Sequence, residues 1–252
     1  MKSPVFGIRH PTSGASKRSA HIGHPRPDIV DRQTARAEWI DTDRVLNIHA
    51  RQAVSNALAP LGARLARAGV TPNAITMVGT AGVVAGALVF FTQGWWFTGT
   101  MVIWGFAMLD VVDGAVARAG GTSSPFGGVL ESTGDRLADA AVFGALAWYF
   151  ARHDQRWLLL AALLCLVLGS LTSYIRARAE AAGMTATVGI AERADRLIIV
   201  LVGTGLTGQN LEVPYVQAIA LWVLVGASTI TVGQRLATVH RQSQERLRAA
   251  QP

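Results

Sequence analysis

The sequence predicts an all-α integral membrane protein: a bundle of six transmembrane helices preceded by an amphipathic helix at the membrane interface. Half of the 252 residues are hydrophobic and only 15% are charged, whereas a soluble domain usually carries about 25% charged residues. Segment 68–109 contains no charged residue, and a transmembrane helix needs roughly 20 apolar residues. The net charge of +7 is concentrated at the chain ends and between apolar stretches, which favours contact with anionic lipid over nucleic-acid binding.

The N-terminal part of the chain is expected to lie outside the bundle. Residues 1–40 are basic, contain scattered Gly, Pro and Ser, and lack the apolar core of a secretory signal, so we interpret them as a disordered basic tail. We expect a membrane domain over 41–240 and a short polar C-terminal tail over 241–252. Within 44–68, apolar residues at helical spacing predict an interfacial amphipathic helix; they are Val54, Leu58, Leu61 and Leu65.

Six stretches are then candidates for membrane spans. A turn with interfacial aromatics, Trp95 and Trp96, separates the first two. The third stretch carries acidic residues in its first half, and the fifth begins with polar residues. The expected helices are 73–92, 96–119, 127–151, 157–175, 190–207 and 213–232.

The distribution of basic residues predicts the orientation in the membrane. Six crossings place 21 of the 23 Lys and Arg residues on the side that contains both chain ends. Only Arg152 and Arg156 fall in the opposite loops. Because cytoplasmic loops carry the excess of Lys and Arg, we expect a multi-pass protein of the cell membrane with both termini in the cytoplasm.

Two consecutive helices carry acids that share a face. Residues three or four apart lie on the same side of a helix. Each charge at the bilayer centre costs about 2.5–3.5 kcal/mol on the insertion scale, and the two nearby arginines, Arg118 and Arg136, are too few to neutralise five acids. The second helix contributes Asp110 and Asp113, and the third contributes Glu131, Asp135 and Asp139.

A divalent cation would compensate for these charges. Clustered carboxylates without His or Cys select hard ions such as Mg²⁺ or Mn²⁺, and a pair of such ions commonly serves phosphoryl chemistry. Small residues, Gly114 and Ala117, keep the face beside Asp113 shallow, and Arg118 is placed to bind a phosphate. Spacing alone leaves a second interpretation open, a proton or ion pathway in a transporter.

A second group of polar residues occurs in the last three expected helices. Guanidinium groups bind phosphate oxygens in pairs, so this group suits a phosphorylated ligand. The alternative is that these arginines extend to lipid headgroups, as positive residues at a cytoplasmic surface often do. The group consists of Ser173, Arg176, Arg193, Arg196 and Arg235.

The acidic motif resembles the signature of the CDP-alcohol phosphotransferases. The pattern Asp110-x-x-Asp113-Gly114-x-x-Ala117-Arg118, eight residues, then Gly127-x-x-x-Glu131-x-x-x-Asp135 follows the family's order and spacing. The resemblance covers residues 45–240. Glu131 departs from it, since the family's third acid is normally aspartate, and the extra methylene shifts the position of the carboxylate oxygens. A shift of preference from Mg²⁺ toward Mn²⁺ is expected, because Mg²⁺ demands near-ideal octahedral geometry.

The resemblance implies a metal-dependent transfer of phosphatidyl from CDP-diacylglycerol to an alcohol, with release of CMP. It implies metal ligation by the four motif acids, and proton removal from the alcohol by Asp135. By the same resemblance, Gly114, Ala117 and Arg118 border the nucleotide, and Asn73 lies near the cytidine. Asp139 lies outside the signature, where an indirect or packing role is at least as plausible as ligation. The implied metal ligands are Asp110, Asp113, Glu131 and Asp135.

The acceptor is suggested by two further segments. "SYIRARAE" and "GIAERADR" resemble acceptor-site segments of actinobacterial phosphatidylinositol phosphate synthases, which implies inositol 1-phosphate as the acceptor. Those enzymes often have lysine where this chain has Arg176. Glycerol 3-phosphate is the alternative acceptor, and a cation- or proton-coupled transporter is the alternative from another class. The resemblance also implies a homodimer. The residues implied to line the inositol phosphate pocket are Ser173, Arg176, Arg193, Arg196 and Arg235.

Overall fold

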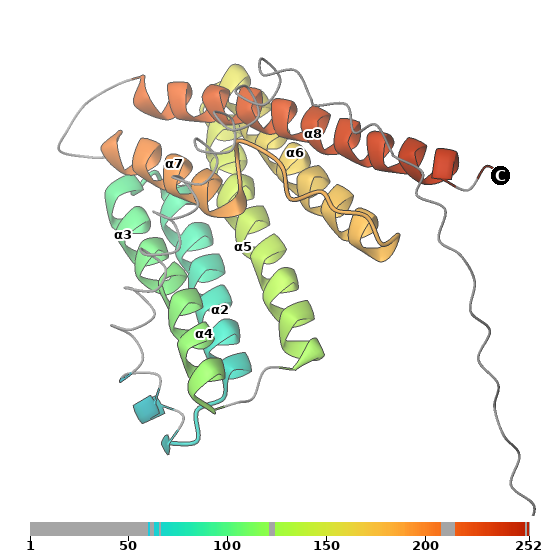
Figure 1. The fold of residues 1–252 in the computed structure, drawn as a ribbon. Coiled ribbons are helices and arrows are strands. Elements are labelled where there is room, and N and C mark those ends of the chain that lie inside the picture. Colours follow the sequence, from blue (N-terminus) through green and yellow to red (C-terminus); the bar gives the residue numbers. More distant parts are fainter. Residues whose placement is uncertain are drawn as a thin grey trace, which may run out of the picture. The chain divides into compact units, whose positions relative to one another are not determined.

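The protein is all-α throughout the part of the chain that the structure describes. The computed structural model describes residues 60, 63–65, 67–120, 124–207, 215–249 and 251, without the side chains of 110, 111 and 118–120. The described residues belong to one compact unit. Their elements are α2 (Pro72–Phe90), the 3₁₀ turn η1 (Phe91–Gln93), α3 (Trp96–Ala107), α4 (Leu109–Gly120), α5 (Pro125–Arg152), α6 (Arg156–Ala181), α7 (Arg193–Leu206) and α8 (Val216–Ala249) (Figure 1).

Four described segments are long and apolar enough to cross a membrane. Two other helices do not meet that criterion: α5 carries acids and Arg136 along its first half, and α7 has only 14 residues. Six crossings therefore stay a prediction, as does the interfacial helix over 44–68, which lies largely outside the described residues. The tail over 1–40 lies wholly outside them. The four segments are Pro72–Gln93, Trp96–Ala117, Arg156–Ala181 and Val216–Ala249.

Local sequence explains the start and end of α2. Thr71 caps its N-terminus by accepting a hydrogen bond from the Ala74 amide at 3.3 Å, and Pro72 occupies the first turn, where its missing N–H costs nothing. The chain reverses after η1 at Gly94, whose φ of +77° is left-handed and is readily adopted by glycine. The expected helix over 73–92 and the turn that follows it are confirmed.

The helix expected over 96–119 is divided in two at Met108. Its halves, α3 and α4, pack against a row of small residues on α2. A Cβ added to Gly82 would lie 2.1 Å from the Phe106 ring, and one added to Gly79 would lie 3.2 Å from the Phe106 carbonyl oxygen. Glycine therefore lets α2 approach the junction between α3 and α4 closely, as small residues do between transmembrane helices.

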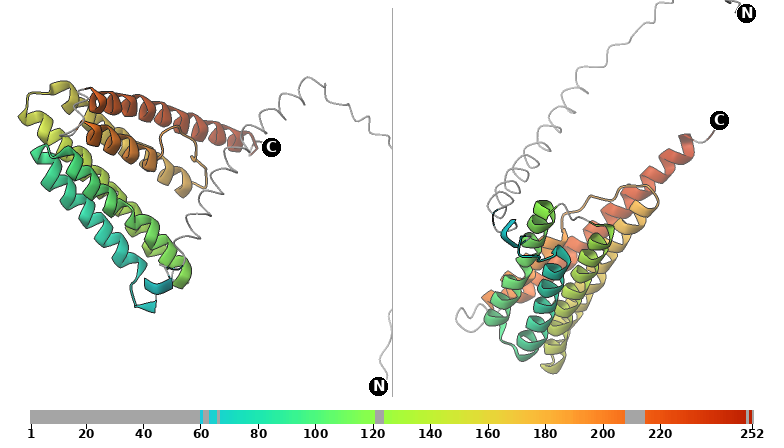
Figure 2. Two further views of the ribbon diagram at one scale, coloured as in Figure 1. Left: turned by 90° about the vertical axis from the view of Figure 1, so that its left-hand side faces the viewer. Right: turned by 90° about the horizontal axis from the view of Figure 1, so that it is seen from below.

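Helix α5 packs along the other side of α2. Ser124 caps its start by accepting the Gly127 amide at 3.0 Å. Close contact with α2 depends on Gly134, where an added Cβ would lie 2.5 Å from Thr80 Oγ1. The buried core lies further along α5, where Leu146 and Phe150 are almost fully buried. Thus α2 contacts α3, α4 and α5 together (Figures 1 and 2).

The C-terminal half is built from α6, α7 and α8, of which α8 packs against both others (Figure 1). Two helices run further than the apolar pattern indicates. Helix α6 continues past the expected residue 175 to Ala181, and α8 continues to Ala249, through most of the expected polar tail. Hydropathy locates only the apolar part of such helices, because their last turns can extend into water. Helix α7 begins at Arg193 behind a capping box formed by Glu192 and Asp195.

Candidate active site

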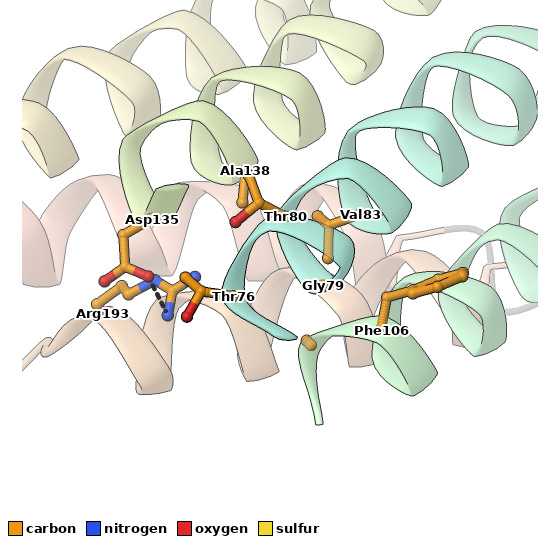
Figure 3. Close-up of a pocket in the computed structure, with 9 residues that line it drawn as sticks. Thr76, Gly79, Thr80, Val83, Phe106, Asp135, Ala138 and Arg193 are labelled. Carbon is orange, nitrogen blue, oxygen red and sulfur yellow. Dashed lines mark ion pairs between the residues drawn. The ribbon is translucent and has the colours of Figure 1, made fainter. Parts of the chain in front are cut away.

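A threonine on α2 contacts one acid of the sequence motif and lines a pocket with a second. The Thr76 hydroxyl donates a hydrogen bond of 2.6 Å to Asp113 Oδ2 of α4. Thr76 also lines a small pocket together with Asp135 of α5 and Arg193 of α7 (Figure 3). The acids of the two helices therefore face a common region beside α2.

We call the four motif acids, Asp110, Asp113, Glu131 and Asp135, the acid wall. Their carboxylates suit a hard divalent cation. Asp113 is buried, while Glu131 is exposed one turn before Asp135. All are carboxylates from α4 and α5, which both pack against α2, and they form the oxygen-only donor set that Mg²⁺ and Mn²⁺ prefer. Within the described side chains, no three His, Cys, Asp or Glu groups already lie close enough to hold a metal ion. The side chain of the first motif acid, Asp110, is outside the described part.

A second and much larger cavity opens beside the acid wall. Its volume is about 1070 Å³, and it lies between α5, α6 and α7, with α8 contributing Arg235. Five arginines and four acids line it, which leaves one net positive charge. The charged lining residues are Glu131, Asp135, Arg136, Arg176, Glu180, Glu192, Arg193, Arg196 and Arg235.

Every residue predicted to bind an acceptor phosphate lies in the lining of this cavity. Ser173 and Arg176 come from α6, Arg193 and Arg196 from α7, and Arg235 from α8. Glu131 and Asp135 of the acid motif lie in the same lining. The tertiary structure thus brings the two groups that were separate in the sequence to one site.

The acid motif and the arginine group are joined by direct ion pairs. Arg193 Nη1 lies 2.7 Å from Asp135 Oδ1, and Arg193 Nε lies 3.9 Å from Asp139 Oδ1. On α5 itself, Arg136 Nη2 lies 3.7 Å from Asp139 Oδ2 and 4.0 Å from Asp135 Oδ2. Carboxylates one turn apart on α5 therefore share guanidinium groups from α5 and α7.

Two of the cavity arginines are almost fully buried and tied to the backbone. Arg196 donates to Thr172 Oγ1 at 3.2 Å and to the Ala191 carbonyl at 3.4 Å. Arg235 donates to the Val188 carbonyl at 2.9 Å and to the Thr172 carbonyl. Buried guanidinium groups with several acceptors are held in a fixed orientation, which argues against the interpretation that these two residues extend to lipid headgroups.

The remaining predicted acceptor residues have partners of their own. Arg176 forms an ion pair of 2.9 Å with Glu180 one turn later on α6, and both side chains are about half exposed. The Ser173 hydroxyl accepts a hydrogen bond from Arg136 Nη1. Arg136 thus orients Ser173 inside the cavity.

The residues expected near the nucleotide lie apart from this lining. Asn73, in the first turn of α2, faces the start of α5, since a Cβ added to Gly127 would lie 3.2 Å from Asn73 Oδ1. Gly114 and Ala117 lie half-buried on α4. The Arg118 side chain is outside the described part.

Sequence reasoning missed several residues that organise the site. Thr76 carried no signal, because a lone threonine in an apolar helix has many possible roles. From the sequence, Arg136 counts only as a neutralising charge, although its position next to Asp135 indicates a contact with the motif. Asp139 lies outside the motif, yet it contacts three arginines of the cavity: Arg136, Arg193 and Arg196.

Comparison with known proteins identifies the class to which this fold and site belong. The family model of the CDP-alcohol phosphatidyltransferases matches residues 69–232. The chain therefore belongs to the CDP-alcohol phosphatidyltransferase family, as its acid motif predicted. The enzyme interpretation is confirmed over that of a transporter.

The chain is also similar to individual members of this family. The chain is 44% identical to a phosphatidylinositol phosphate synthase of Streptomyces avermitilis, over 80% of this chain and 85% of that protein. It is 46% identical to one from Mycobacterium marinum, over 75% of this chain and 82% of the relative.

Solved structures share the fold. The crystal structure of the Mycobacterium tuberculosis phosphatidylinositol phosphate synthase with CDP-DAG bound matches with a TM-score of 0.69 at 44% identity, covering 72% of this chain and 92% of that one. A second structure of that enzyme, in complex with manganese and citrate, also matches with a TM-score of 0.69 and covers 88% of that chain.

Proposed function

We propose that this enzyme transfers the phosphatidyl group of CDP-diacylglycerol to inositol 1-phosphate, giving phosphatidylinositol phosphate and CMP. The observation that carries the proposal is the cavity in which Asp135 and five arginines meet. A carboxylate beside a basic cavity suits an acceptor that has both a reactive hydroxyl and a phosphate. The names and ligands of the similar enzymes support this choice.

The acid wall would receive the donor. Asp110, Asp113, Glu131 and Asp135 would hold two divalent ions, Mg²⁺ or Mn²⁺, whose charge stabilises the diphosphate and the leaving CMP. Thr76 orients the Asp113 carboxylate through its 2.6 Å hydrogen bond. Asn73, Gly114, Ala117 and Arg118 would border the CDP group.

The arginine-lined cavity would receive the acceptor. Ser173, Arg176, Arg193, Arg196 and Arg235 would bind its phosphate, since guanidinium groups match phosphate oxygens in pairs. The bound acceptor would then present its hydroxyl toward Asp135. Holding the reactants in place in this way lowers the entropic part of the barrier.

The chemical step needs one proton transfer. Asp135 would take the proton of the acceptor hydroxyl, whose oxygen attacks the phosphorus attached to diacylglycerol. The bond from that phosphorus to the CMP oxygen breaks, and CMP leaves. Arg193, 2.7 Å from Asp135 Oδ1, would hold this carboxylate in place before the transfer.

The wider setting follows from the same proposal. The enzyme would cross the cell membrane six times, with both termini in the cytoplasm where CDP-diacylglycerol headgroups and soluble inositol phosphate meet. It would work as a homodimer without a nucleic-acid partner. The domain limits at 40 and 240 belong to this part of the proposal.

The test is a CMP-release assay on the purified enzyme with CDP-diacylglycerol and a panel of acceptors. We expect release with inositol 1-phosphate in Mg²⁺ or Mn²⁺, and no release after chelation with EDTA. Free inositol, which lacks the phosphate, is the matched negative acceptor. Faster release with glycerol 3-phosphate than with inositol 1-phosphate would overturn the acceptor assignment.

A further inference from the structure

Asp139 lies behind the arginines of the cavity. Its side chain is only 10% exposed, and it does not belong to the cavity lining, whereas Arg136, Arg193 and Arg196 all do. Its ion pairs therefore link it to the cavity through these three arginines.

Both oxygens of Asp139 face guanidinium groups. Oδ2 accepts a hydrogen bond from Arg196 Nη2 at 3.4 Å and lies 3.7 Å from Arg136 Nη2. Oδ1 lies 3.9 Å from Arg193 Nε. One carboxylate thus joins arginines from two helices, α5 and α7.

Three guanidinium groups this close together need a neighbouring carboxylate to offset their positive charge. Like charges repel one another strongly where water is scarce, and Arg196 is only 3% exposed. A buried ion pair that loses one partner leaves an uncompensated charge behind. Without Asp139, Arg196 would lose its ion pair, while Arg193 and Arg136 would keep their contacts with Asp135. The three arginines would then be expected to lose their common orientation toward the cavity.

We propose that Asp139 is a positioning residue of the acceptor site. It holds Arg136, Arg193 and Arg196 in the arrangement that receives the phosphate of the acceptor alcohol, without touching the substrate. The inference rests on the proposed function, because it takes the cavity to be the acceptor site. It assigns to Asp139 a role separate from metal ligation by the motif acids.

The test replaces Asp139 by Asn, which keeps the shape and removes the charge. We expect the KM for the acceptor to rise about tenfold or more, the loss typical of hydrogen bonds to charged groups. The KM for CDP-diacylglycerol should stay within about twofold. Equilibrium binding of labelled inositol 1-phosphate to the EDTA-treated enzyme should weaken by the same factor, which separates this role from metal binding. Asp154→Asn, at an exposed loop residue, is the matched control and should change none of these values.

Two further variants test the mechanism. Asp139→Glu keeps the charge on a longer side chain and should recover part of the acceptor affinity. In a double-mutant cycle with Arg196→Lys, the two losses should be less than additive, because both act on one array of contacts. If Asp139→Asn does not fold, Asp139→Glu decides: acceptor binding weakened selectively supports the role, and unchanged acceptor binding overturns it.

Several results would overturn the inference while leaving the proposed function intact. An unchanged or lower acceptor KM in Asp139→Asn would mean that the carboxylate is dispensable or competes with the phosphate. Equal losses for both substrates, or additive losses in the cycle, would indicate a purely structural residue. If the unmodified enzyme prefers glycerol 3-phosphate, the proposed function fails instead, and the same measurements with that acceptor still test Asp139.

Discussion

The two halves of the site differ in how the chain builds them. The acid wall comes from a short stretch, residues 110–135, with fixed helical spacing inside each of two neighbouring helices. The arginine-lined cavity collects residues from α5, α6, α7 and α8, up to Arg235. A local motif thus defines the first half, and only the tertiary packing of the bundle defines the second.

This difference suggests that the two halves of the site have separate roles. The acid wall depends on helical spacing, which an insertion within either helix would disrupt, and this suits the proposed binding of the donor diphosphate. The cavity depends on long side chains from several helices, which would contact the proposed acceptor from different sides. Arg193 connects the two halves, since it lies 2.7 Å from Asp135 Oδ1 and 3.9 Å from Asp139 Oδ1.

The largest effect is expected from Asp135→Asn, which removes the proposed base from the acid wall. CMP release should fall at least about 1000-fold, within the range of general acid–base catalysis. Binding of inositol 1-phosphate in the cavity should change much less, because the arginines remain. Steady-state CMP release and equilibrium acceptor binding measure the two effects. Asp154→Asn is the control for the same chemical change, and a turnover number preserved in Asp135→Asn would contradict the assigned role.

A smaller effect, confined to the cavity, is expected from Arg235→Lys. Lysine keeps the charge but loses the paired donors that reach the carbonyls of Val188 and Thr172. The KM for the acceptor should rise about tenfold, while kcat and the KM for CDP-diacylglycerol stay within about twofold.

Arg246→Lys provides the matched control for this prediction. Arg246 also lies on α8 and donates to the same connection between α6 and α7, at the Ala182 carbonyl at 2.9 Å, but it does not line the cavity. Its substitution should leave the acceptor KM unchanged. Equal effects of the two substitutions would mean that anchoring of the connecting segment, and not contact with the acceptor, decides acceptor affinity.

The sequence reveals the acid wall more completely than the cavity. Fixed spacing of Asp110, Asp113, Glu131 and Asp135 predicts shared helical faces and a family, because helical periodicity is a local property. The helices themselves follow from hydropathy, yet their polar ends do not. The break at Met108 and the extension of α8 to Ala249 depend on packing and on surroundings beyond the apolar segment.

Residues that act through tertiary contacts could not be predicted from the sequence. The sequence predicts that Arg193 and Arg196 bind a phosphate but cannot show that Asp139 contacts both of them and Arg136. Likewise, Thr76 reaches Asp113 only because small residues let α2 approach α4 closely. Such contacts depend on how the helices pack together. The spacing of residues within a single helix does not contain that information.

A weaker effect should follow from Glu131→Asp in the acid wall. The shorter side chain restores the acid usual in the family and moves the carboxylate closer to the α5 backbone. Mg²⁺ tolerates less distortion of its coordination than other divalent ions. The ratio of activity in Mg²⁺ to activity in Mn²⁺ should therefore rise by about threefold, which corresponds to less than about 1.4 kcal/mol. Metal titrations of CMP release measure the ratio. Glu245→Asp, exposed on α8, is the control, and an unchanged ratio in Glu131→Asp would remove Glu131 from the proposed ligands.

The smallest effect is expected from Gly169→Ala on α6. Gly169 does not line the cavity but lies next to Arg196, which does. The added Cβ would lie 3.3 Å from Arg196 Nε, so the guanidinium group must shift by a few tenths of an ångström. Alanine also favours the helix by about 0.8–1 kcal/mol over glycine, which offsets the strain, and the thermal stability should change little.

The displacement of Arg196 should still raise the acceptor KM, by about twofold. Gly144→Ala on α5 is the matched control, since an added Cβ there meets nothing within 4 Å. It should gain the helical stabilisation without any change in acceptor KM. Melting temperatures and acceptor KM values of the two variants compare these effects directly. If both variants were stabilised equally and bound the acceptor equally well, the orientation of Arg196 would not limit binding, and the cavity would tolerate more movement than its buried contacts indicate.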